Sequence, residues 1–182
     1  MSDMIPEPSR KKDSVTLSCR IDKTLYELLQ KDCKDKGISL NSLVNSIAKR
    51  YISWEKYAAE IGYIPLATET VRLLFDNLDD KTIQMIANRI GRTIPREMTL
   101  LMFNKIDFNS IVAFLVITSS RYGMVQHNVD GDIHDLIVHH GVSKKFSKFL
   151  AEVGKVMAYD LSFKFQVMSV DSKVLSVRIE ET

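Results

Sequence analysis

Apolar and polar residues alternate over a short stretch near the start of the chain. In TLSCRID, residues 16–22, the side chains of Leu17, Cys19 and Ile21 alternate with polar ones, which is the period of a half-buried strand. No second strand follows nearby. A lone strand with one buried face leaves backbone N–H and C=O groups unpaired, which costs free energy. The pattern therefore predicts a strand whose partner comes from elsewhere.

Two amphipathic helices are expected after this strand. Asp22 is a typical helix N-cap residue, Gly37 a typical C-cap, and Ser39 a typical cap for the next helix. Apolar residues recur on one face of each helix: Leu25, Leu28, Leu29 and Cys33 in the first, and Leu40, Leu43, Val44, Ile47, Ala48, Tyr51 and Ile52 in the second. So small a unit cannot bury these faces alone. We expect a twofold dimer, in which the strand pairs antiparallel with its copy and four helices cover one side of the ribbon.

In such a dimer the polar side chains Thr16, Ser18 and Arg20 face outward from a two-stranded ribbon. A ribbon of this kind fits the major groove of B-DNA. Arginine bonds guanine bidentately, and serine or threonine bonds several base edges, so we expect these three residues to contact bases. The start of the second helix presents backbone N–H groups and hydroxyls suited to a phosphate. The expected phosphate contacts there are Ser39, Leu40, Asn41 and Ser42.

Residues 14–53 resemble the ribbon-helix-helix family of transcription regulators, the Arc/MetJ superfamily. The resemblance rests on the strand, the RID at its end, the Gly37-x-Ser39 turn and the apolar spacing of the second helix. It implies an obligate homodimer that reads DNA through the polar face of the strand, with the start of the second helix at the phosphate. Asp22 departs from the family pattern, since many members carry proline there, but either residue begins a helix.

A basic arm is expected before the strand. The 182-residue chain has a formal net charge of only +2, which does not by itself indicate nucleic acid. Arg10, Lys11 and Lys12 form a cluster, and basic arms often contact phosphates, although a solvated tail is the alternative. Residues 13–15 then stand where a basic residue is common in the family. That departure would weaken DNA affinity without changing the binding mode.

The remainder of the chain predicts a second domain of the α+β class. Gly62 and Pro65 mark the boundary, which gives a flexible basic arm at 1–13, a ribbon-helix-helix domain at 14–62 and an accessory domain for sensing or oligomerisation at 66–182. Helices are expected after Thr68, from Asp79 or Asp80 to Gly91, and from Phe108 to Gly123. A hairpin around Asp130-Gly131, a helix over 143–159 and a second hairpin on either side of VDSK follow, so we expect a helical segment and then a small antiparallel sheet.

All four histidines fall between residues 127 and 140: His127, His134, His139 and His140. Histidine is a common transition-metal ligand, and a His-bearing β-rich domain resembles the architecture of the nickel-responsive ribbon-helix-helix repressors. The spacing does not reproduce their metal motif. We therefore expect surface or hydrogen-bonded histidines and no cofactor. The candidates for a metal site, should one exist, are His127, His134 and His140.

Other function classes find less support. The sequence has no phosphate-binding glycine loop, nucleophile elbow or Cys–His pair of informative spacing, so we expect no enzyme. It has neither an apolar run of membrane-spanning length nor a signal peptide, and its two cysteines fall in predicted strand and helix, which favours a cytoplasmic protein without a membrane partner.

The prediction is a sequence-specific transcriptional regulator that binds double-stranded DNA as a homodimer or higher homo-oligomer, with an unknown small molecule or metal as effector. Two alternatives stay open. The N-terminal unit is a dimerisation module for a protein partner, as in antitoxins of this fold, with a disordered C-terminal tail around the partner. Otherwise the protein is a metal-responsive regulator whose ligand site lies in the C-terminal domain.

Overall fold

The computed structural model describes residues 14–182, in a chain that divides into two compact units, residues 1–56 and 57–182. The division falls inside a helical stretch, earlier than the boundary expected at Gly62 and Pro65. The predicted basic arm, with Arg10, Lys11 and Lys12, lies outside the described residues.

The first unit contains the two predicted helices, α1 (Lys23–Lys36) and α2 (Leu40–Arg50). The Asp22 carboxylate accepts the backbone N–H groups of Thr24 and Leu25 at 2.8 and 3.1 Å, and so caps α1. Gly37 ends that helix with a left-handed φ of +64°, a conformation that favours glycine. After α2 the helical path continues through the π-helical turn η1 (Tyr51–Glu55) into α3 (Lys56–Glu60). Both helix predictions are confirmed.

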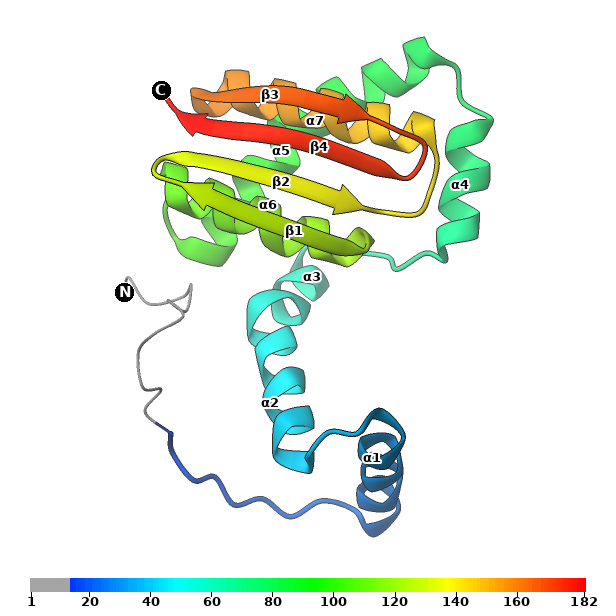
Figure 1. The fold of residues 1–182 in the computed structure, drawn as a ribbon, viewed down its shortest axis with the longest axis vertical. Coiled ribbons are helices and arrows are strands. Elements are labelled where there is room, and N and C mark those ends of the chain that lie inside the picture. The colour runs from blue at the N-terminus through cyan, green and yellow to red at the C-terminus, as the bar shows by residue number, and fades with distance from the viewer. Residues whose placement is uncertain (1–13) are drawn as a thin grey trace. The chain divides into compact units, whose positions relative to one another are not determined.

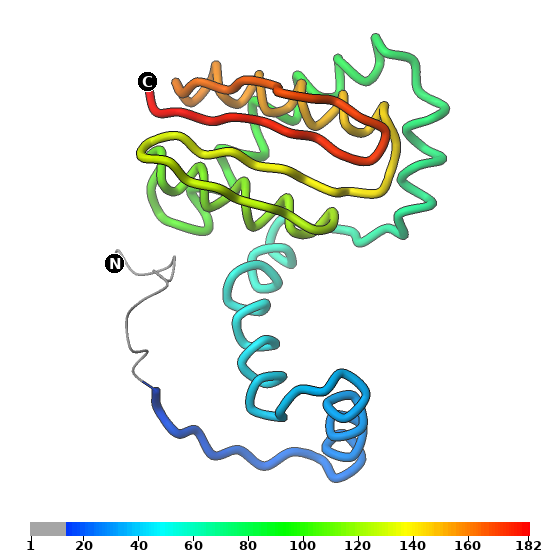
Figure 2. The backbone as a smooth tube through the Cα atoms, viewed as in Figure 1, coloured from blue at the N-terminus to red at the C-terminus, as the bar shows by residue number. Residues whose placement is uncertain are grey.

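The second unit combines helices with one four-stranded antiparallel sheet of order β1-β2-β4-β3. Its elements are α4 (Thr68–Asp76), α5 (Asp80–Phe103), α6 (Phe108–Tyr122), β1 (Met124–Asp130), β2 (Ile133–His139), α7 (Lys144–Leu161), β3 (Phe163–Val170) and β4 (Val174–Glu181). Figure 2 shows the two hairpins, β1–β2 and β3–β4, joined through α7. The predicted α+β class and small antiparallel sheet are confirmed for this unit.

Each strand alternates between the two faces of the sheet. The side chains buried on one face are Leu136, Val138, Leu175, Val177 and Ile179. Helices α6 and α7 cover this face (Figure 1), α6 against β1 and β2, and α7 against β3 and β4. The opposite face is mixed, with the partly buried Ile133 and Ile137 of β2 beside polar side chains. There Asp135 and Arg178, which are cross-strand neighbours, form a bidentate ion pair with N–O distances of 2.8 and 2.9 Å.

A second apolar cluster lies between the helices of this unit. Ile83 and Ala87 of α5 pack with Phe146 and Phe149 of α7, and Phe75 of α4 completes the contact. Asp79 caps α5 by accepting the backbone N–H of Thr82 at 2.7 Å, which confirms the predicted start of that helix. Helix α4 itself packs against this cluster through Phe75.

The predicted end of α5 at Gly91 is wrong, because the helix continues to Phe103 through both Gly91 and Pro95. Gly91 is buried where α5 crosses α7. A Cβ atom there would lie 2.8 Å from Val156 Cβ and 2.9 Å from the Val153 carbonyl oxygen. Glycine is thus present for close helix packing rather than for termination. The tertiary contact outweighs its low helix propensity.

Replacing Gly91 with alanine is expected to destabilise the second unit. Overpacking a core costs about 1–3 kcal/mol, while alanine regains up to about 1 kcal/mol in helix propensity, so we expect a net loss of about 1 kcal/mol. Urea unfolding of the full chain measures it. Arg92→Ala, an exposed neighbour on the same helix, serves as the control and should change stability by less than about 0.5 kcal/mol. Equal stability of the two variants would contradict the packing role.

Within residues 14–182, no single helix combines the length and apolar composition needed to cross a membrane. Helices α5 and α6 together meet the criteria of length and composition, but they are bent by 104° where they join.

Candidate functional site

Residues 14–22 form neither a helix nor a paired strand in the single chain. The apolar side chains that the sequence assigns to a shared core are open to solvent there, Leu17 by 85% and Ile21 by 44%. Cys19 is also exposed, as a free thiol. The described part of one chain thus leaves the apolar side chains of this segment uncovered. The predicted strand stays a prediction that depends on a second strand.

The helices that follow expose apolar side chains as well. Leu25 is 49% and Leu28 61% exposed on α1, and Val44 and Ile47 of α2 are exposed too. Within α1, Cys33 is the only described residue that is fully buried, and α2 has none. Soluble monomers rarely expose contiguous apolar surface of this kind, which usually marks an interaction site. The first unit therefore has apolar side chains in the pattern of a folded core, but most of these side chains are exposed to solvent in the single chain.

The three candidate base-reading residues, Thr16, Ser18 and Arg20, are all exposed on the extended segment. Their side chains alternate with the apolar ones along the sequence. In an extended backbone, successive side chains point to opposite sides. A partner strand that covered the apolar side would leave these three on the open side.

The start of α2 has the geometry of a capped helix N-terminus. Ser39 Oγ accepts the backbone N–H of Ser42 at 3.1 Å, and the two hydroxyl oxygens lie 2.9 Å apart. The N–H groups of the first helical residues have no acceptor inside a helix. At this terminus the free N–H groups are those of Leu40 and Asn41. The candidate phosphate site therefore offers two backbone N–H groups and two hydroxyls.

The structure brings two of the candidate metal ligands together and separates the third. His127 Nε2 and His134 Nδ1 lie 2.9 Å apart on the β1–β2 hairpin. His140 follows the end of β2, and six residues of strand span about 20 Å from His134. Among residues 14–182, no group of three or more His, Cys, Asp or Glu side chains is placed to hold a metal ion.

His140 belongs to a buried hydrogen-bond network that the sequence analysis missed. The side chain is 2% exposed. Its Nδ1 accepts the backbone N–H of Val142 at 3.1 Å, so the proton is on Nε2, which lies 2.7 Å from Ser147 Oγ. That hydroxyl donates to the Asp171 carbonyl at 2.6 Å. The network ties β2, α7 and the β3–β4 turn together. Because the imidazole donates to the hydroxyl, this is a structural network and not an activated nucleophile.

Acid should destabilise the second unit through His140. Burial lowers the pKa of His140 below its usual value of 6.5, and the nearby His139 lowers it further. The unfolded chain then binds this proton at a higher pH than the folded chain, so stability is present above pH 6.5 and is lost as the pH falls. We expect the free energy of unfolding to decrease from pH 7.5 to 5, a window above the ordinary range of carboxylates.

The matched variant for this prediction is His140→Gln, which should show a smaller decrease over the same pH range. Urea unfolding at each pH measures both. Burial also lowers the pKa values of His127 and His134, so part of the decrease should persist in the variant. An undiminished pH dependence would contradict a neutral, buried His140.

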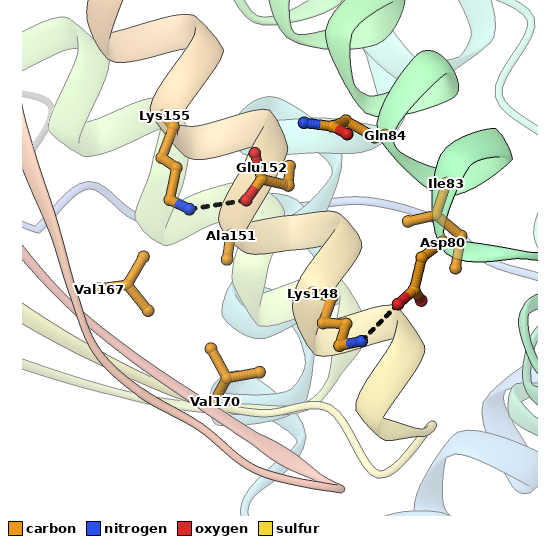
Figure 3. A pocket seen from close by; sticks show the side chains of 9 residues that line it. All are labelled: Asp80, Ile83, Gln84, Lys148, Ala151, Glu152, Lys155, Val167 and Val170. Atoms are coloured by element: carbon orange, nitrogen blue, oxygen red, sulfur yellow. Dashed lines mark hydrogen bonds and ion pairs between the residues drawn. The ribbon is translucent and has the colours of Figure 1, made fainter.

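The second unit also has a pocket of about 280 Å³ between α5, α7 and β3. Figure 3 shows its charged side chains in pairs, Lys148 Nζ 2.9 Å from an Asp80 oxygen and Lys155 Nζ 2.6 Å from a Glu152 oxygen. The lining residues are Asp80, Ile83, Gln84, Lys148, Ala151, Glu152, Lys155, Val167 and Val170. Since each cation faces its own anion, the pocket lacks the excess of one charge that binds phosphate or carboxylate ligands.

One signal in the sequence pointed to the His127–His134 contact without being used. A two-residue hairpin loop fixes the pairing of both strands. The observed loop is Gly131-Asp132, between the paired residues Asp130 and Ile133, one position later than the Asp130-Gly131 turn that the sequence suggested.

Comparison of the chain with protein-family models, curated proteins and solved structures found no match.

Proposed function

We propose that the protein is a sequence-specific DNA-binding regulator that acts as a homodimer through its N-terminal unit. Two copies of residues 16–22 pair antiparallel to form a ribbon, and α1 and α2 of both chains close over its apolar side. The polar side, with Thr16, Ser18 and Arg20, enters the major groove. The start of α2 binds the flanking phosphate.

The observation that supports this proposal is the exposure of an alternating apolar face in the single chain. Leu17 and Ile21 of the extended segment, and Leu25 and Leu28 of α1, are all open to solvent. A second copy of the same segment offers an equally apolar face and equally unpaired backbone groups. Twofold symmetry satisfies both needs with one contact, because the same patch serves both chains. The polar residues on the remaining side are those that read base edges.

A protein partner for the N-terminal unit is the competing proposal. In that alternative, the C-terminal residues form a disordered tail around the partner protein. Here the corresponding residues form the paired strands β3 and β4. The polar triad on the strand also has no role in that alternative. Both features favour DNA over a protein partner.

Selection of bound fragments from genomic DNA tests the proposal. The purified full chain is expected to enrich a short inverted repeat, since a twofold dimer reads two symmetric half-sites. The control in the same experiment is the variant Thr16→Ala/Ser18→Ala/Arg20→Ala, which keeps the apolar side chains of the predicted strand. It should stay dimeric and lose the enrichment. Equal enrichment by the triple variant, or none by the natural chain, would overturn the proposal.

A further inference from the structure

Strand β1 forms one edge of the four-stranded sheet (Figure 1), and within residues 14–182 no strand pairs with its outer side. Its residues are exposed, apart from the partly buried Val125. Two of the exposed side chains are apolar, Met124 at 60% and Val129 at 57%. The unpaired N–H and C=O groups of an edge strand are a template for another strand. The outer side of β1 is therefore a surface with which another chain can pair.

The two edges of the sheet differ in how they are protected. At the other edge, β3 carries Lys164 and has an irregular register between Val167 and Ser169. A lysine and an irregular register both hinder the approach of a further strand. In contrast, β1 has the sequence MVQHNVD, without lysine, arginine or proline, and its register with β2 is regular throughout. Of the two edges, β1 is the unprotected one.

The hairpin turn determines which backbone groups of β1 point outward. The two-residue loop begins at Gly131, whose φ is +58°, and its flanking residues Asp130 and Ile133 are paired. Residues that flank such a loop exchange hydrogen bonds, and bonded and non-bonded pairs then alternate along the two strands. The residues whose N–H and C=O groups point away from β2 are therefore Val125, His127 and Val129.

The side chain in the middle of β1 leaves the outer side open. His127 Nε2 lies 2.9 Å from His134 Nδ1, and the two rings are 20° from parallel. The ring of His127 thus leans inward over β2. The Phe108 ring packs edge-on against His134 at 5.4 Å and restrains its orientation. This hydrogen bond therefore keeps the imidazole of His127 away from the edge of the sheet.

We propose that β1 pairs antiparallel with β1 of a second copy of this chain, with His127 of both chains at the twofold axis. In this register Val125 of each chain lies opposite Val129 of the other, and Gln126 lies opposite Asn128. Side chains of similar chemistry thus face each other on both sides of the ribbon. The outward backbone groups meet their counterparts in about six hydrogen bonds. The two sheets then form one continuous sheet.

Self-complementarity favours a second copy over an unrelated partner. The twofold axis places Asp130 of one chain opposite Met124 of the other, at the end of the ribbon where Arg121 is exposed. Opposite charges therefore meet at both ends. Asp130 is the only Asp, Glu, Lys or Arg in β1, so no like charges of these residues oppose each other along the strand. Burial lowers the pKa of His127, so the two imidazoles at the axis are neutral at pH 7 and do not repel.

This contact is weak by itself. One pair of seven-residue strands buries less surface than the about 1,200 Å² at which stable interfaces begin, so single chains at micromolar concentration stay separate. Between chains that are already joined through their first units, the effective concentration of the second units is high, and the same contact forms. The population of the contact in the natural protein therefore rests on the proposed homodimer.

Disulfide trapping between two variants of the full chain tests the register. Gln126 of one chain and Asn128 of the other form a pair without mutual hydrogen bonds, whose Cα atoms are about 4.5 Å apart. A disulfide spans that distance. Two copies of the same residue are diagonal neighbours about 7–8 Å apart, beyond the reach of a disulfide. The variants are Gln126→Cys and Asn128→Cys, each with Cys19→Ser to remove the exposed native thiol.

In a glutathione redox buffer the mixture of the two variants should form a covalent dimer at least about tenfold faster than either variant alone. Gln166→Cys, which is exposed on the other edge strand, replaces Gln126→Cys in the control mixture and should give no such increase. Thermal unfolding of the reduced variants checks that all are equally folded. Absence of the covalent dimer from the mixture, or equal rates in the separate variants, would overturn the pairing.

Repeating the mixture with Leu17→Asp in both variants separates this contact from the first-unit dimer. At about 1 mM protein, which matches the effective concentration that a short tether provides, the covalent dimer should still form. At micromolar concentration it should form at least about tenfold more slowly than without Leu17→Asp. No covalent dimer at 1 mM would overturn the β1 contact whether or not the first units pair, and sedimentation of the natural chain tests that first-unit dimer independently.

Discussion

Replacing Leu17 with aspartate is expected to separate the protein into single chains and to abolish specific DNA binding. In the proposed dimer Leu17 points into the shared apolar core, while in the single chain it is almost fully exposed. Burying an unpaired carboxylate costs at least about 3 kcal/mol. Two copies enter each dimer, so the dissociation constant should rise by about 10⁴-fold. Sedimentation equilibrium over a range of protein concentrations measures this change.

Thr16→Asp is the matched control, because it places the same charge on the neighbouring residue of the opposite face. That variant should remain a dimer and lose DNA affinity by repulsion from the phosphates. A Leu17→Asp protein that sediments as a full-strength dimer would rule out strand pairing as the dimer contact. Loss of the dimer in both variants would show that the two faces are not distinguished.

Replacing Arg20 with alanine should weaken binding to the selected operator and relax the choice of one base pair per half-site. A bidentate contact to a base is worth about 1–3 kcal/mol, and the two half-sites of a dimer each lose one. Fluorescence anisotropy with the operator and with single-base variants of it measures the loss. Unchanged preference at every base pair would exclude Arg20 as a reader.

Lys11→Ala provides the contrast to this result. A phosphate contact carries no sequence information, so this variant should weaken binding to all sequences alike. The slope of log affinity against log salt should fall by about one unit. A change of sequence preference in Lys11→Ala would mean that the arm also reads bases.

Local signals in the sequence predicted most elements of the second unit and both helices of the first. Asp22, Gly37, Ser39 and Asp79 are caps, and each acts at its own helix end through contacts within four residues. Strand alternation likewise predicted both hairpins of the sheet. These features depend on neighbours close in the sequence, which is why one sequence suffices to find them.

Contacts between distant segments account for what the sequence did not reveal. Gly91 reads as a helix end, but its role depends on Val153 and Val156 of another helix. His140 reads as a strand residue near His134, whereas its bonds run to Ser147 on α7. Nothing local distinguishes these roles, because the partners are many residues away along the chain.

The N-terminal strand has a different limitation, since its predicted partner is another molecule. Residues 16–21 alternate as a strand does, yet they pair with no other strand within residues 14–182 of the single chain. In the structure of one chain these residues form neither a helix nor a paired strand. The prediction concerns an assembly, so it needs a measurement on the assembled protein.

Amide hydrogen exchange over residues 16–21 tests the central claim most directly. In an antiparallel pair every second residue directs its N–H group to the partner strand, so alternate amides of this segment should be protected in the natural dimer. The protection should disappear in Leu17→Asp. Exchange of all these amides at the rate of an unstructured peptide, in protein that still binds its selected operator, would contradict the paired ribbon.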